Sequence, residues 1–258
     1  MLKQILIEKA FPFPKSVYAV HDAIRFFVDS KLDALIIDFF AGSGTTLHAV
    51  NLLNAEDGGH RRCILVTNNE VNDPGDRQQL TAKGFHPGDV EWEKRGIARY
   101  ATWPRTVCSI EGHDVNGNPL QGRYLGSDLP MADGFKANAA YFKLGFLDKN
   151  AVALGRQFKE MLPTLWMKAG AHGPCPTMDE DTPKMLILPE NKFAILVDEK
   201  QYMEFTEKLD EYPEIETVFI VTDSESGYRD MIAGLDVKAS YQLYRDYLDN
   251  FRINAARR

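Results

Sequence analysis

The chain has 258 residues, enough for one large domain or two modest ones with a full hydrophobic core. Hydrophobic residues make up 44% and charged residues 26%, as in an ordinary soluble globular protein, and no apolar run is long enough to span a bilayer. The formal charge of −7 argues against a surface dedicated to duplex DNA, because neutralising phosphates requires an excess of basic residues.

The cysteines and histidines predict no metal site. Three cysteines are widely spaced and odd in number, so they indicate neither a disulfide framework nor a metal cage, and the six histidines are scattered. The start of the chain lacks the apolar core and cleavage site of a signal peptide. We therefore expect a cytoplasmic protein with no metal and no membrane partner.

A proline-punctuated segment precedes the first predicted helix. Pro12 keeps the approach extended, and Pro14 suits the first turn of a helix that apolar residues at helical spacing predict over residues 20–28. Lys15 and Ser16 lie just before that helix. Taken alone, these residues indicate only where a helix begins.

The next segment has the sequence pattern of a nucleotide-binding turn between a strand and a helix. Residues 34–37 form a short apolar run typical of a buried strand, and Asp38 follows where that strand would end. Gly42 and Gly44 come next in a tight turn, and residues 45–53 have the apolar spacing of a helix. Glycines let the backbone approach a ligand closely, and the first amides of a helix point at it.

The glycine turn departs from two common nucleotide motifs. A phosphate-binding P-loop requires Lys directly after its second Gly, where this chain has Thr45, and the dinucleotide fingerprint requires a third Gly. The turn instead resembles motif I of the S-adenosylmethionine-dependent DNA amino-methyltransferases, Asp-x-Phe-x-Gly-Ser-Gly-Thr-Thr. The matching residues are Asp38, Phe40, Gly42, Ser43, Gly44, Thr45 and Thr46. An ordinary strand-to-helix turn is the plainer alternative.

A second predicted strand follows the motif I helix. Residues 63–67 are apolar, and a right-handed crossover would place them beside the first strand. Glu70 comes soon after, and an acidic residue after the second strand of a nucleotide fold typically accepts hydrogen bonds from ribose hydroxyls. Glu70 resembles the family's motif II acid. Asn69, or a helix-capping role for Glu70, remains open as an alternative.

The middle of the chain mixes turn and helix signals. Residues 73–88 are rich in Gly and Pro and predict a loop, and residues 90–100 predict a helix. The Asn-Gly pair at positions 116 and 117 predicts a hairpin turn, with residues 108–110 and 122–125 as its strands. Two groups of arginines could contact DNA, although solvated helix faces explain them more simply. They are Arg95, Arg99 and Arg105, and Arg252, Arg257 and Arg258.

The remainder of the chain alternates strand and helix patterns, which indicates a second α/β unit after a loose boundary near residue 125. The expected strands cover residues 138–146, 185–188, 193–197 and 217–221, and the expected helices cover residues 152–166, 202–209, 227–235 and 241–251. Asp198 and Asp223 follow strands. They indicate helix capping and solvent exposure rather than a ligand site, because no glycine loop lies nearby.

The resemblance implies an α/β fold in two parts. The first, residues 1–125, would be a partial Rossmann-like methyltransferase sheet that holds the cofactor half of the site. The second, residues 126–258, would be a smaller α/β or α+β unit of unknown role. No internal repeat is strong enough to group these segments differently.

The resemblance also implies the contacts of S-adenosylmethionine. In the family, the methionine moiety lies against the motif I acid and the turn, here Asp38 and the backbone of Phe40, Ala41, Gly42, Ser43, Gly44, Thr45 and Thr46. Glu70 would hold the ribose. The segment with Lys15 and Ser16 resembles motif X, so these two residues would line the far wall of the cofactor site.

The family's catalytic motif does not occur in this chain. That motif reads Asp/Asn/Ser-Pro-Pro followed by an aromatic residue, and it holds the exocyclic amine of a base flipped out of the duplex. In the β-class, which includes type III restriction-modification enzymes, it precedes motifs X, I, II and III. The resemblance therefore implies a C-terminal part, with catalysis dependent on upstream residues or a partner subunit. No residue here is expected to be catalytic.

Two functional classes stay open. The chain is either the cofactor-binding portion of a site-specific DNA methyltransferase, for adenine rather than cytosine, or a non-catalytic assembly module that contacts a restriction subunit or another defence partner. A small-molecule methyltransferase is disfavoured, because the pairing of Phe-Pro-Lys with Gly-Ser-Gly-Thr-Thr resembles DNA enzymes.

Overall fold

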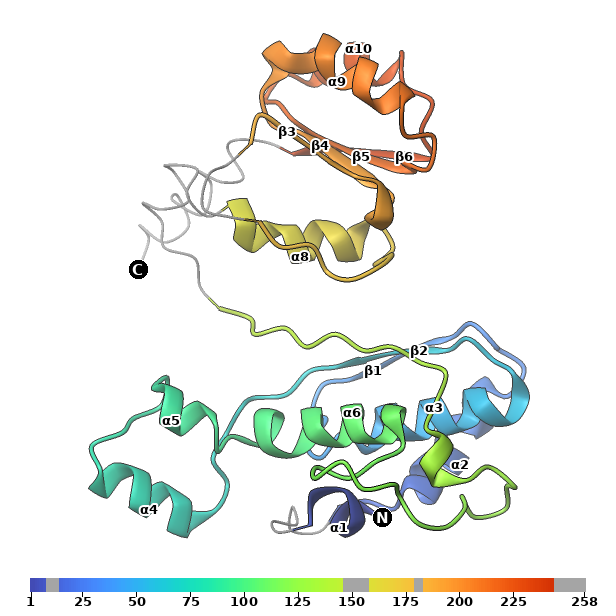
Figure 1. The fold of residues 1–258 in the computed structure, drawn as a ribbon, viewed down its shortest axis with the longest axis vertical. Coiled ribbons are helices and arrows are strands. Elements are labelled where there is room, and N and C mark those ends of the chain that lie inside the picture. Colours follow the sequence, from blue (N-terminus) through green and yellow to red (C-terminus); the bar gives the residue numbers. More distant parts are fainter. Residues whose placement is uncertain (8–13, 146–157, 179–182, 244–258) are drawn as a thin grey trace. The chain divides into compact units, whose positions relative to one another are not determined.

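The computed structural model describes most of the chain, namely residues 1–7, 14–145, 158–178 and 183–243. The chain divides into two compact units, Met1–Tyr141 and Phe142–Arg258. Both units combine helices with small sheets that contain parallel strands, so the expected α/β class is confirmed (Figure 1). No helix in these described ranges is long and apolar enough to cross a membrane.

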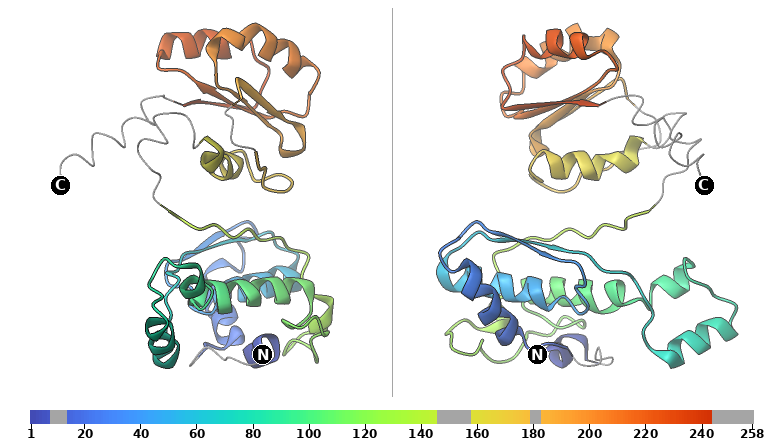
Figure 2. Two further views of the ribbon diagram at one scale, coloured as in Figure 1. Left: turned by 60° about the vertical axis from the view of Figure 1, so that its left-hand side comes forward. Right: turned by 180° about the vertical axis from the view of Figure 1, so that it is seen from behind.

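The first unit is mainly helical, with one short sheet (Figure 2). Its elements in chain order are α1 (Leu2–Leu6), α2 (Val17–Val28), β1 (Leu35–Asp38), α3 (Thr45–Asp57), β2 (Arg62–Leu65), α4 (Pro74–Ala82), α5 (Val90–Glu93), the π-helix η1 (Ala98–Thr102), α6 (Trp103–Glu111) and the 3₁₀-helix η2 (Met131–Asp133). The expected strand–turn–helix–strand order from residue 34 to residue 67 is confirmed.

Strands β1 and β2 pair in parallel, with Ile37 opposite Ile64. Helix α3 connects them and packs against β2, as a crossover helix must. The opposite face of the sheet is only partly covered by the residues that the structure describes. The apolar side chains on that face are between 46% and 50% exposed: Leu35, Ile37, Ile64 and Val66.

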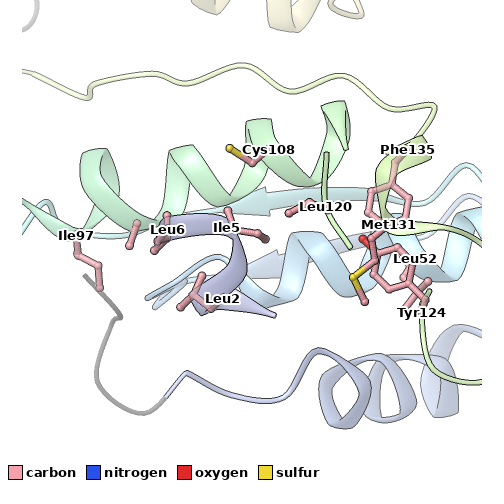
Figure 3. Close-up of a cluster of buried hydrophobic side chains, with 11 residues drawn as sticks. Leu2, Ile5, Leu6, Leu52, Ile97, Cys108, Leu120, Tyr124, Met131 and Phe135 are labelled. Carbon is pink, nitrogen blue, oxygen red and sulfur yellow. The ribbon is translucent and has the colours of Figure 1, made fainter. Parts of the chain in front are cut away.

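The core of the first unit lies between α1, α3, α6 and the segment after α6. Figure 3 shows Ile5 of α1 and Leu52 of α3 within one buried cluster, which also includes Tyr124, Met131 and Phe135. Because Met131 and Phe135 are buried in this cluster, the segment around them belongs to the first unit. The division between units therefore falls at Tyr141, later than the boundary expected near residue 125.

The expected loop over residues 73–88 contains a helix, α4. Pro74 occupies the first turn of α4, where a missing N–H costs nothing. The Asp73 carboxylate caps the helix by accepting a 2.9 Å hydrogen bond from the Asp76 amide. The expected helix over residues 90–100 is interrupted, because α5 ends at Glu93 and η1 begins only after Gly96.

The expected hairpin keeps its turn and loses its strands. Residues 108–110 lie inside α6, and one isolated bridge, His113 to Pro119, closes the turn. Asp114 shapes that turn by accepting hydrogen bonds from the amides of Asn116 and Asn118, at 2.8 and 2.9 Å. The strand expected over residues 138–146 is also wrong, since residues 138–145 form no strand and residue 146 lies outside the described part.

The second unit has a four-stranded sheet in the order β3-β4-β5-β6, with β3 antiparallel and the others parallel. Its elements are α8 (Phe158–Lys168), β3 (Met185–Leu188), η3 (Pro189–Asn191), β4 (Phe193–Leu196), η4 (Glu199–Gln201), α9 (Tyr202–Asp210), β5 (Thr217–Val221), α10 (Glu225–Ile232) and β6 (Ala239–Leu243). Helix α8 packs on one face of the sheet, and α9 and α10 pack on the other (Figure 1).

The expected strands over residues 185–188, 193–197 and 217–221 are confirmed. The terminal helix expected from residue 241 is wrong at its start, because Tyr241 pairs with Phe219 within β6. The remaining residues of that expected helix, 244–251, lie outside the described residues. Of the helix expected over residues 152–166, residues 152–157 also lie outside the described residues, and the rest lies within α8. Asp198 caps η4 by accepting a hydrogen bond from the Lys200 amide, as expected of a capping residue.

Candidate cofactor site

The carboxylate of Asp38 connects the end of β1 to the start of α3. One oxygen accepts a 3.0 Å hydrogen bond from the Phe40 amide, and the other accepts a 2.6 Å bond from the Thr46 hydroxyl. Asp38 thereby closes the glycine turn across its base. The turn itself lies between these two bonds.

Two glycines give the turn its shape. Gly42 and Gly44 have φ values of 52° and 74°, a left-handed region that favours glycine. A Cβ on Gly44 would lie 3.2 Å from Cγ2 of Thr102, so the turn is also pressed against the end of η1. The Thr102 hydroxyl donates a hydrogen bond to the Gly42 carbonyl, which holds the turn from the same side.

The turn leaves several backbone amides free. The Ala41 amide donates to the Val66 carbonyl at 3.3 Å and the Gly44 amide donates to the Ala41 carbonyl at 2.8 Å. Within the described ranges, no acceptor bonds the amides of Gly42, Ser43, Thr45 and Thr46. Because Thr45 and Thr46 begin a 13-residue helix, these amides lie at the positive end of its dipole. The arrangement suits a ligand with negative or acceptor groups.

Glu70 follows the C-terminal end of β2. Because β1 and β2 are parallel, this end lies at the same edge of the sheet as the glycine turn that follows β1. Its side chain is exposed, and its carboxylate accepts a long 3.4 Å bond from the Asn68 amide group. Asn69 has a different role, since its side chain donates to the Glu93 carbonyl at 2.8 Å and accepts from the Arg99 amide at 3.2 Å. Glu70 is therefore more available to a ligand than Asn69.

The π-helix η1 joins the two loops. At one end the Ile97 amide donates to the Glu70 carbonyl at 2.9 Å, and at the other end Thr102 contacts Gly42 and Gly44. Single-turn π-helices are rare in proteins, and those that occur are often found at functional sites. Thr102 was absent from the predicted site, because its contact joins residues 60 positions apart in the chain.

A buried polar cluster lies beneath the turn. The Arg105 guanidinium donates to the Thr45 and Ser43 hydroxyls at 2.7 and 3.1 Å, and the His48 ring bonds the Tyr124 hydroxyl at 2.9 Å. Burial lowers the pKa of Arg105 to about 10 and that of His48 to about 3, with the Arg105 charge as a second cause for His48. At neutral pH, Arg105 is therefore charged and His48 is neutral.

The three nearby arginines of the sequence do not form one basic surface. Arg95 pairs with Asp76 at 2.6 Å, Arg99 lies 5.0 Å from the centre of the Tyr141 ring, and Arg105 is buried. The expectation of solvated helix faces is thus wrong for Arg105. The other group, Arg252, Arg257 and Arg258, lies outside the described residues.

Lys15 and Ser16 lie at the start of α2 and are exposed. The Ser16 carbonyl accepts a 3.2 Å bond from the Val20 amide, and its hydroxyl makes no capping bond. No hydrogen bond or ion pair joins either residue to the glycine turn in the part of the chain that the structure describes. Phe40 is 92% exposed, so its ring adds apolar surface beside the turn.

No three His, Cys, Asp or Glu side chains lie close enough to hold a metal ion among the described residues. All three cysteines are free thiols. Burial raises the pKa of the Cys63 thiol to about 12, so the thiol stays protonated at neutral pH. The polar groups around the turn are thus the candidate ligand-binding groups of the first unit.

Comparison with known proteins points to one class of enzyme. No family model matches the chain. The Mod subunit of the type III restriction-modification enzyme EcoPI, from Escherichia phage P1, is 44% identical over 70 residues, 27% of this chain and 10% of that protein. The type II methyltransferase M.KpnI, from Klebsiella pneumoniae, is 46% identical over 68 residues, 26% of this chain and 16% of that protein.

A third relative gives the same result. The Mod subunit of the type III restriction-modification enzyme StyLTI, from Salmonella typhimurium strain LT2, is 47% identical over 60 residues, 23% of this chain and 9% of that protein. About a quarter of the chain is therefore similar to restriction-modification methyltransferase proteins. The chain spans between 9% and 16% of the curated relatives that it matches.

Proposed function

We propose that this chain is the cofactor-binding portion of a site-specific DNA adenine methyltransferase, with S-adenosylmethionine as its ligand. The observation that carries the proposal is the glycine turn, where four backbone amides lack acceptors among the described residues at the start of α3. The likeness to methyltransferase proteins of restriction-modification systems supports the choice of ligand.

The residues around the turn fit the parts of this cofactor. The free amides of Gly42, Ser43, Thr45 and Thr46 would bind the carboxylate of the methionine moiety. The exposed carboxylate of Glu70, after the parallel strand, would accept hydrogen bonds from the ribose hydroxyls. When bound, S-adenosylmethionine supplies an activated methyl group. This chain's own residues hold and orient the cofactor, and none is proposed to act on the base.

The half-exposed apolar face of the first sheet supports a requirement for a second polypeptide segment. Parallel sheets are normally covered on both faces, yet Ile37 and Ile64 of this sheet remain half-exposed. Upstream residues or a separate subunit carrying the Asp-Pro-Pro-Tyr-type motif would cover this face, bind DNA and flip the adenine.

Isothermal titration calorimetry with S-adenosylmethionine tests the proposal. We expect saturable binding by the unmodified chain, and its loss in Gly42→Asp and Asp38→Ala. Gly84→Asp is the matched control, because Gly84 also has a positive φ of 79° and has open space around its Cβ position. No heat from the unmodified chain at high micromolar cofactor would contradict the proposal.

The second candidate is a non-catalytic assembly module of a restriction-modification or defence system. The apolar face of the β1–β2 sheet favours it, because such a face suits a protein partner whether or not a cofactor binds. The same calorimetry separates the candidates. Absence of binding, with an intact fold by circular dichroism, would support the module.

A further inference from the structure

Arg105 is the most deeply buried cation of the described residues near the turn. It extends from α6, and its residue surface is 2% exposed. Its Nη1 donates to the Thr45 hydroxyl at 2.7 Å, the Ser43 hydroxyl at 3.1 Å and the Ser43 carbonyl at 3.3 Å. Its Nε donates to Nδ1 of His48 at 3.4 Å. Every one of these acceptors is neutral.

The charge of Arg105 has no carboxylate partner in the described ranges. No carboxylate oxygen there lies within 4.0 Å of its guanidinium. Arg61, at the other end of α3, is 4% exposed and shows the contrast, because its guanidinium pairs with Asp57 at 2.9 Å. A buried cation without an anion is energetically costly. Packing alone therefore does not account for the buried charge of Arg105.

The groups around Arg105 cannot supply the missing negative charge. A guanidinium only donates hydrogen bonds, so Nδ1 of His48 is an acceptor and Nε2 carries the proton that is donated to the Tyr124 hydroxyl. Burial raises the pKa of Tyr124, so that its hydroxyl stays neutral. The cluster of Arg105, His48 and Tyr124 therefore carries a net positive charge beneath the turn.

The guanidinium contacts two of the four residues whose backbone amides lack an acceptor in the described part of the chain. Ser43 and Thr45 each bond Arg105 and each have a backbone amide without an acceptor in the described part of the chain. An anionic group bound by those amides would be held by the same two residues that the guanidinium contacts. Opposite charges attract more strongly where water is excluded, as it is around the buried guanidinium.

We propose that Arg105 is a positioning residue that makes the glycine turn selective for a ligand bearing a carboxylate. It acts through Ser43 and Thr45, which it holds in place, and through its own charge beneath them. The inference rests on the proposed function, and it adds the origin of the turn's preference for the amino-acid end of S-adenosylmethionine.

Calorimetry on the full chain tests this inference with two ligands, S-adenosylmethionine and its decarboxylated form. The second ligand keeps the sulfonium, the amine and the nucleoside and lacks only the carboxylate. We expect the unmodified chain to prefer S-adenosylmethionine by at least about tenfold, equivalent to about 1.4 kcal/mol. Arg105→Gln, which keeps hydrogen-bond donors without the charge, should lose most of that preference.

Two further variants separate charge from packing. Arg105→Lys keeps the charge and should retain most of the preference, even if both affinities fall. Arg61→Gln removes a buried arginine from the other end of α3 and should leave the preference unchanged, because Arg61 does not contact the turn.

Equal weakening of both ligands in Arg105→Gln would overturn the role of the charge and leave the cofactor site standing. If Arg105→Gln does not fold, the test compares Arg105→Lys with the unmodified chain. The same preference for S-adenosylmethionine in both proteins supports the inference, and loss of that preference in Arg105→Lys overturns it. No binding of either ligand by the unmodified chain would overturn both this inference and the proposed function.

Discussion

The Thr46 hydroxyl donates a 2.6 Å hydrogen bond to the carboxylate of Asp38, eight residues earlier in the chain. The other oxygen of that carboxylate accepts from the Phe40 amide. The Asp38 carboxylate thus stabilises the glycine turn through hydrogen bonds to residues on both sides of it, in addition to any contact with a ligand. Substitutions at the two residues should therefore affect both stability and cofactor binding.

Thr46→Val removes this hydrogen bond with little change in shape. We expect the free energy of unfolding of the first unit to fall by about 2 kcal/mol, because hydrogen bonds to charged groups are the stronger ones. Denaturant unfolding followed by circular dichroism measures the change. Thr81→Val, at an exposed position of α4, is the control, and an equal effect of the two variants would contradict the expectation.

Gly44→Ala and Gly58→Ala form a matched pair at the two ends of α3. Both glycines have positive φ, 74° and 71°, so each alanine should cost about 1–2 kcal/mol from backbone strain. Gly44→Ala also presses Cβ against Thr102, whereas nothing lies within 4 Å of the Gly58 position. We expect a further loss of about 1–3 kcal/mol and weaker cofactor binding for Gly44→Ala alone. Thermal unfolding and calorimetry should show this difference; identical behaviour would rule out the contact.

The stability of the first unit should fall in mild acid through His48. Burial lowers its folded-state pKa from 6.5 to about 3, so between those pH values the unfolded chain binds the proton and the folded chain does not. Stability then rises with pH in this window, by up to about 1.4 kcal/mol per pH unit for one group. Denaturant unfolding between pH 4 and about pH 7 should give a smaller slope for His48→Gln than for the control His60→Gln. Equal slopes would contradict the buried neutral imidazole.

Asn69 and Gly96 should show coupled effects on stability. A Cβ on Gly96 would lie 2.2 Å from Oδ1 of Asn69, so Gly96→Ala must displace the side chain that holds the Glu70 loop to Glu93. Once Asn69→Ala has removed that side chain, Gly96→Ala should cost little more. A double-mutant cycle by denaturant unfolding should give a coupling of about 1 kcal/mol or more. Strict additivity would show that the two residues do not meet.

Local patterns predicted the strand–turn–helix segment well, because each of its parts carries a local signal. The branched apolar run before Asp38 and the paired glycines at positions 42 and 44 both act over a few residues. The apolar run that contains Phe193 and Ile195 is a local signal of the same kind, and it predicts β4 in the second sheet. The Gly and Pro residues around Pro74 predict a loop where the structure has α4, because proline and glycine are as frequent in turns as at a helix start.

The contacts that complete the candidate site could not be predicted in this way. Thr102 reaches Gly42, and Arg105 reaches Ser43, across about 60 positions of chain. Neither residue belongs to a local sequence pattern that predicts a contact with the turn. An arginine in a helix is normally expected to have an exposed side chain. The local periodicity predicts a helix at Tyr241, but pairing with Phe219 places this residue in β6, because tertiary pairing overrides local periodicity.

Amide proton–nitrogen correlation spectra of the labelled chain, recorded during titration with S-adenosylmethionine, test the cofactor turn most directly. We expect saturable shifts centred on the amides of Gly42, Ser43, Thr45 and Thr46, because these donors would gain an acceptor. Unchanged resonances for those four residues at saturating cofactor, in a chain whose spectrum is otherwise that of a folded protein, would contradict it.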